Sequence, residues 1–187
     1  MDKEFTSLEA WNPFEISRVG EDTADGARLR AVLRGPQDSD YCGGEFVLDI
    51  VITVDYPFQP PRVSFVTNIF HPCVVPTIDA ADHRRGDFPA ASLPGGAIDL
   101  LELKDSWSPA LNLNRLLSRI FKLLHDPVRA TARTGHGGIC QTASELLGDA
   151  IALRDGWDDA FTPVALPQEF QNEVRAWVVA HATPGIH

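Results

Sequence analysis

Alternating apolar and polar positions dominate the first third of the chain. Over residues 28–34, leucine and alanine alternate with arginine, which predicts a half-buried strand. A second alternation over 46–54 predicts another strand, and residues 63–65 indicate a shorter one. The prolines within 56–61 cannot continue a central strand, because proline supplies no ladder donor. The pattern therefore favours an antiparallel meander.

The second half of the chain changes to helical spacing. Asn112 is a candidate N-cap, and the leucines and isoleucine behind it recur every three or four residues until Asp126-Pro127. Weaker helical patterns cover about 142–153 and the stretch that starts at Pro167. Strands followed by helices indicate an α+β fold.

Two segments show no such regularity. Residues 1–26 are ambiguous: Phe5, Leu8 and Trp11 would share one helical face, and Pro13 would end it. Residues 74–98 are rich in Ala, Asp, Gly and Pro, which predicts a long surface loop.

Length and charge narrow the class of protein. The 187 residues suit a single domain, 1–187. A net charge of −10 disfavours nucleic acid as a partner. Three scattered cysteines indicate a reducing compartment and no metal site. We find no signal peptide and no apolar run long enough for membrane insertion, so we expect a cytoplasmic protein, with the nucleus as the other option.

Seven short motifs occur in an order that resembles the ubiquitin-conjugating enzyme (UBC) family. The resemblance covers roughly residues 28–127 and extends more loosely to 181. It is carried by Gly35-Pro36, Tyr41-Cys42-Gly43-Gly44-x-Phe46, Asp55-Tyr56-Pro57-Phe58-Gln59-Pro60-Pro61, Val63-x-Phe65, Ile69-Phe70-His71-Pro72, Trp107-Ser108-Pro109-Ala110-Leu111 and Leu123-Leu124-x-Asp126-Pro127.

The resemblance implies a UBC-like fold. We expect a four-stranded antiparallel meander sheet with a central helix and C-terminal helices within 140–187. The N-terminal helix is expected to be shortened, and 74–98 to be an inserted loop that covers the mouth of the active site.

The chemistry that the resemblance implies is altered at three positions. The family's cysteine, eight residues before the tryptophan of its WSPAL motif, corresponds to Asp99. A carboxylate would give an anhydride-like product in place of a thioester. In the family an asparagine follows the His-Pro pair, and here Cys73 takes its position. An acidic residue that helps to deprotonate or position the attacking lysine in the family corresponds to about Thr131. We therefore expect no catalytic residue and no cofactor, and Trp107 only packs a loop.

Three functions remain open at this stage. The first is a non-catalytic adaptor or scaffold, with a weaker resemblance to the Fused Toes group. That group works with Hook-type proteins in dynein-linked vesicle transport. The second is a conjugating enzyme with a displaced nucleophile, either Cys73 or Cys140, whose thiol would lie at the start of a helix. The third is a ubiquitin-binding partner of an active conjugating enzyme.

Two candidate binding surfaces follow. The resemblance places ligase docking at Phe58, Pro109 and Ala110. The last helix offers an apolar stripe to a partner, or packs on the domain, through Phe170, Val174, Trp177 and Val178.

Overall fold

Four antiparallel strands form one sheet in sequence order. The computed structural model gives them as β1 (Phe14–Arg18), β2 (Gly26–Arg34), β3 (Glu45–Thr53) and β4 (Arg62–Phe65). Leu29 faces Ile50 across β2 and β3, and Leu48 faces Phe65 across β3 and β4. All four side chains are buried, so the alternation read from the sequence sets the register. The antiparallel meander is confirmed.

The residues described are 14–21, 26–76, 95–104, 106–134, 140–148 and 165–184. The predicted short N-terminal helix before Pro13 lies outside them. Within the described ranges, no helix is long and apolar enough to cross a membrane.

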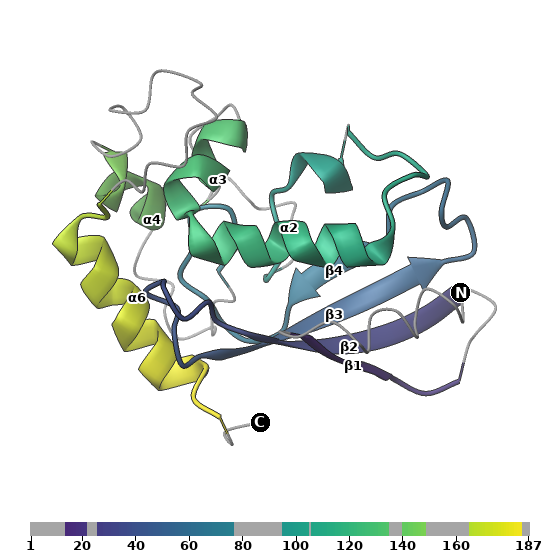
Figure 1. Cartoon of the computed structure of the whole chain (residues 1–187), viewed down its shortest axis with the longest axis horizontal. Coiled ribbons are helices and arrows are strands. Elements are labelled where there is room, and N and C mark those ends of the chain that lie inside the picture. The colour runs from purple at the N-terminus through teal and green to yellow at the C-terminus, as the bar shows by residue number, and fades with distance from the viewer. Residues whose placement is uncertain are drawn as a thin grey trace.

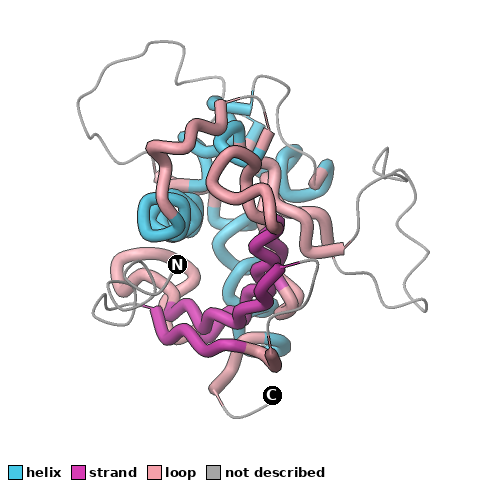
Figure 2. The backbone as a smooth tube through the Cα atoms, turned by 90° about the vertical axis from the view of Figure 1, so that its right-hand side faces the viewer, coloured by secondary structure: helices cyan, strands magenta, loops and turns pink. Residues whose placement is uncertain are grey.

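The helices gather mainly on one side of the sheet. They are η1 (Leu101–Leu103), α2 (Leu113–His125), α3 (Pro127–Thr134), α4 (Gln141–Leu146) and α6 (Gln168–His181). Figure 1 shows α2 lying across one face of the sheet, with α3, α4 and α6 at one end. Figure 2 shows the same layers from the side, with the sheet as a twisted layer below most of the helices.

The central helix α2 forms where its sequence pattern predicts. The side chain of Asn112 accepts a hydrogen bond from the Arg115 N–H, which caps the first turn. Six apolar residues on one face are buried: Leu113, Leu116, Leu117, Ile120, Leu123 and Leu124. Asp126 ends α2 but also starts α3, because its carboxylate accepts the Arg129 N–H at 2.9 Å.

The last helix belongs to the core. Phe170 and Val174 are fully buried, and the Phe70 ring lies 5.8 Å from those of both Phe170 and Trp177. The partner-binding prediction is therefore wrong for Phe170 and Val174, whose stripe packs on the domain. Only Val179 is a large exposed apolar residue of this helix.

The segment 74–98 is not a loop at its two ends. Val74 and Ile98 form an antiparallel bridge, and Ser64 and Ala97 form another, which extends the pairing of β4. Gly96 has φ +79° and lies so close to β4 that an added Cβ would meet the Phe65 carbonyl at 1.9 Å. The surface-loop prediction is therefore wrong for Val74, Ala97 and Ile98, whereas 75–76 and 95–96 are irregular or turn residues. The expected cover over the active site, 77–94, lies outside the described residues.

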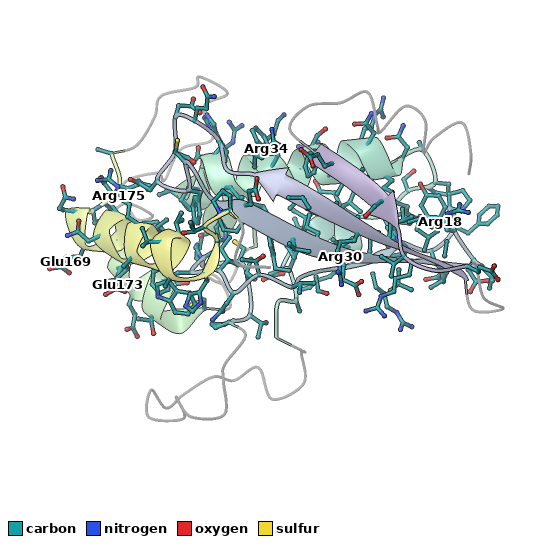
Figure 3. All side chains as sticks on the ribbon, turned by 90° about the horizontal axis from the view of Figure 1, so that it is seen from below. Arg18, Arg30, Arg34, Glu169, Glu173 and Arg175 are labelled. Carbon is teal, nitrogen blue, oxygen red and sulfur yellow. The ribbon has the colours of Figure 1, made fainter. Side chains whose placement is uncertain are left out.

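The opposite face of the sheet carries charged side chains. Figure 3 shows this face, with Arg30 and Arg34 on β2, Arg18 at the end of β1, and α6 to one side. Arg34 pairs with Glu15 across β1 and β2, and Arg28 binds Asp49 at 2.7 Å. These exposed pairs contribute little stability individually.

Candidate functional site

His71 is a buried, neutral histidine. Its Nδ1 accepts the Cys73 N–H at 3.0 Å, so its Nε2 carries the hydrogen and donates to the Leu123 carbonyl at 3.0 Å. Burial lowers the pKa of His71 from 6.5 to about 4, and the Leu123 carbonyl offsets this only in part. The imidazole ring therefore links the backbone at Pro72-Cys73 to α2. Both ring nitrogens are engaged in these two hydrogen bonds.

Cys73 lies in the same buried cluster. Its Sγ is 3.9 Å from the Oγ1 of Thr131, whose hydroxyl donates to the Pro127 carbonyl at 2.7 Å. Burial raises the pKa of the Cys73 thiol to about 12, and the contact with Thr131 lowers it only slightly. A thiolate is the nucleophilic form of cysteine, so this sulfur is unsuited to attack.

Asp99 is held beside Cys73 by the backbone and by an ion pair. Its N–H donates to the Cys73 carbonyl at 2.7 Å. Its side chain is 2% exposed, and Oδ1 accepts from the Lys104 ammonium at 2.5 Å, while Lys104 is 41% exposed. This geometry fits a structural hydrogen-bonding role for Asp99 and does not fit a solvated loop acid.

Cys140 joins this cluster from α4. Its N–H donates to the Pro72 carbonyl at 2.9 Å, and its side chain is buried. Burial raises the pKa of the Cys140 thiol, although the Ala143 N–H acts in the opposite direction. Cys140 lies at the start of a helix, and the effect of burial on its pKa exceeds that of the Ala143 N–H.

Trp107 fastens a second region. Its indole N–H donates to the Pro57 carbonyl at 2.8 Å, and its ring packs on Tyr56 at 6.1 Å. Two loops fifty residues apart are thereby joined. Phe58 is 78% exposed on one loop, and Pro109 and Ala110 are exposed on the other.

Known proteins share both this sequence pattern and this arrangement. Residues 1–78 match the sequence model of the ubiquitin-conjugating enzyme family. The E2 domain of a Toxoplasma gondii ubiquitin conjugating enzyme is 28% identical and superposes with a TM-score of 0.67, covering 97% of this chain and 95% of that one. This chain is a UBC-fold protein. Ubc12 of S. cerevisiae is 20% identical, with a TM-score of 0.64, covering 93% of this chain and 72% of that one.

The UBC fold brings most of the predicted positions together. His71, Pro72, Cys73, Asp99 and Thr131 form one buried cluster, linked by the contacts above. Trp107 belongs to the other region, with Phe58, Pro109 and Ala110. The family match ends before Asp99, so the correspondence of Asp99 to the family's cysteine rests on motif order and on spacing.

The sequence analysis missed the partner of Asp99 and a nearby cavity. Lys104 follows Asp99 by five residues, and η1 between them folds the ammonium back onto the carboxylate. A basic residue shortly after a suspected buried acid was the available signal. Among the described residues, no group of three His, Cys, Asp or Glu is arranged to hold a metal ion.

Proposed function

We propose that this UBC-fold chain is a non-catalytic adaptor that binds proteins through its surface and transfers no modifier. The observation that carries the proposal is the state of Asp99. At the position where the family pattern has its cysteine, the chain has a carboxylate that is buried and paired with Lys104. A carboxylate that is buried from solvent and paired with a cation is suited to a structural role.

The two buried thiols offer a poor replacement. Cys73 is fully buried and Cys140 is 1% exposed, and burial raises the pKa of both. An approaching activating enzyme would find neither sulfur exposed. These facts disfavour the displaced-nucleophile alternative.

The surface around Phe58, Pro109 and Ala110 is the best candidate for partner binding. Exposed aromatic and proline side chains on a rigid base are typical of protein interfaces. The base here is the hydrogen bond from Trp107 to Pro57, which holds both loops in one arrangement. A ubiquitin-ligase domain is the partner class that the UBC resemblance favours for this surface. Hook-type proteins, ubiquitin and an active conjugating enzyme are the other candidates, in the cytoplasm or nucleus.

The test of the chemistry is a charging assay with activating enzyme, ATP and a panel of ubiquitin-like modifiers. We expect no adduct that a reducing agent removes. Cys42 is exposed, so Cys42→Ser identifies adventitious labelling of that thiol. A reducible adduct that persists in Cys42→Ser and disappears in Cys73→Ser or Cys140→Ser would refute the non-catalytic proposal.

The test of the surface is binding to a panel of purified ligase domains, Hook-type proteins, ubiquitin and active conjugating enzymes. We expect Phe58→Ala to weaken binding of the true partner at least about tenfold, since interface aromatics often contribute more than 1 kcal/mol. Val179→Ala is the matched control, because Val179 is 71% exposed on α6. Equal binding by wild type and Phe58→Ala would place the adaptor surface elsewhere.

A further inference from the structure

A cavity of about 420 Å³ lies beside Asp99, between η1 and the end of α2. This volume falls within the range of small-molecule sites. Arg119, Lys122 and Leu123 line it at helical spacing along one side of α2, and Arg129 continues the lining from α3. In Figure 1 the turn that contains η1 precedes α2 and lies beside it. The adaptor function makes no use of this cavity.

The inner part of the cavity is apolar. Leu100 and Leu123 are buried, and Leu101 and Phe121 are half-buried. Burying an apolar ligand against aliphatic and aromatic side chains is favourable, because it removes apolar surface from water. The cavity is therefore suited to a hydrophobic body.

The acidic residues of the lining are already engaged within the protein. Asp99 accepts from Lys104, and Oε1 of Glu102 lies 3.5 Å from Nε of Arg119. Asp126 caps α3 through the Arg129 N–H. A ligand ammonium would have to compete with these contacts, and the second oxygens, Oδ2 of Asp99 and Oε2 of Glu102, are buried and present no surface to a ligand. The lining therefore disfavours amines.

The basic residues are more accessible than the acidic ones. Arg119 is 42% exposed, and its Nε lies 3.5 Å from the Glu102 carboxylate, longer than a strong charge-assisted hydrogen bond. Lys122 is exposed and Arg129 is half-buried. Neither of these two side chains makes an ion pair within the ranges that the structure describes. Three cations thus border an apolar cavity whose acids are occupied.

From this arrangement we infer that the cavity binds a small ligand with an apolar body and a carboxylate. The body lies against Leu100, Leu101 and Leu123, and the carboxylate meets Lys122, Arg129 and the terminal nitrogens of Arg119. A guanidinium or ammonium binds a carboxylate through charge-assisted hydrogen bonds. The inference does not depend on whether the protein is an adaptor or an enzyme.

The test compares naphthylacetate with its uncharged counterpart, naphthylacetamide, on the full chain. Amide chemical-shift changes in an NMR titration report both the affinity and the location. We expect the carboxylate to bind at least about tenfold more tightly, the effect of one charge-assisted contact. The shifted amides should belong to η1, the end of α2 and the start of α3.

Two variants test the cations one at a time. Lys122→Gln and Arg129→Gln should each weaken naphthylacetate binding about tenfold and leave naphthylacetamide binding unchanged. Arg115→Gln removes an exposed cation of the same helix that does not line the cavity, so it should have no effect.

Each of the following results overturns the inference. The first is that neither probe binds, and the second is that both probes bind with equal affinity. The third is that the chemical-shift changes are confined to another face of the protein. The fourth is that Lys122→Gln and Arg129→Gln both bind naphthylacetate with wild-type affinity. Unfolding of a variant is detected in its own amide spectrum. If one variant is unfolded, the other still decides, because each removes a single contact.

Discussion

Burying a carboxylate costs several kcal/mol unless a cation or hydrogen bonds compensate for its lost hydration. Asp99 is buried, while its cation Lys104 remains 41% exposed. The two halves of this ion pair are therefore unequal. Removing the Asp99 carboxylate leaves the Lys104 ammonium in contact with water. Removing the Lys104 ammonium leaves the buried Asp99 charge without its main counter-ion.

This inequality gives a prediction at the scale of single residues. We expect Lys104→Met to lower the free energy of unfolding by about 2 kcal/mol and Asp99→Asn by about 1 kcal/mol. The double variant should cost less than the sum of the two. Urea denaturation measures all three. A larger loss for Asp99→Asn than for Lys104→Met would contradict this account of the pair.

The buried histidine gives a prediction about pH. The pKa of His71 is lowered from 6.5 to about 4, so between these values the unfolded chain binds a proton that the folded chain does not. Stability therefore rises with pH across this window, and acidification from 6.5 to 4 removes about 3 kcal/mol.

The matched variant for this effect is His71→Asn, which cannot titrate but still offers an oxygen to the Cys73 N–H. It should be less stable overall, and the slope of unfolding free energy against pH should fall by one proton. Urea denaturation at several pH values between 4 and 6.5 measures the slope. An unchanged slope would assign the pH dependence to other groups.

At the scale of elements, burial separates the true role of α6 from the one its sequence suggested. Phe170 is fully buried against Phe70, whereas Val179 is 71% exposed. We expect Phe170→Ala to destabilise the fold by about 3 kcal/mol, through lost burial and a residual cavity. Val179→Ala should change stability by less than about 0.5 kcal/mol. A small effect of Phe170→Ala would indicate that α6 docks only loosely.

Periodicity predicted the long elements and the four-residue β4, and it missed β1 and α3. The strands β2 and β3 alternate over nine residues each, and α2 repeats over thirteen, so each pattern is unambiguous. The strand β1 has only five residues and follows a proline. The helix α3 was missed because Asp126-Pro127 was read only as a stop. An aspartate followed by proline is also a favoured helix start, with Asp as N-cap and Pro in the first turn.

The sequence likewise predicted one property of the site and not another. The motif order placed His71, Cys73, Asp99 and Thr131 together, because the spacing of the sequence matched a known fold. It did not give their burial, which depends on how far α2, α3 and the 95–100 segment close over them. The pairing of Asp99 with Lys104 was also out of reach, since it depends on the turn made by η1.

At the scale of the whole molecule, thioester chemistry needs several conditions at once. A thiol must be exposed, and groups must surround it that stabilise an oxyanion and position the attacking amine. Here Asp99, which the motif spacing assigns to the nucleophile position, has a side chain that is 2% exposed, the adjacent Cys73 offers no amide side chain, and Thr131 offers no carboxylate. If the chain is an adaptor, restoring one residue cannot restore the reaction.

We therefore expect Asp99→Cys to remain folded but to form little or no reducible adduct with ubiquitin in the presence of activating enzyme and ATP. The introduced thiol should also react far more slowly with a thiol reagent than Cys42, which is exposed and serves as the internal standard. A non-reducing gel and the two reaction rates measure these outcomes, with Asp99→Ser as the control for any adduct on other residues. Rapid labelling of the introduced thiol, followed by efficient transfer of ubiquitin to lysine, would show that the site opens in solution and that the neighbouring substitutions do not matter.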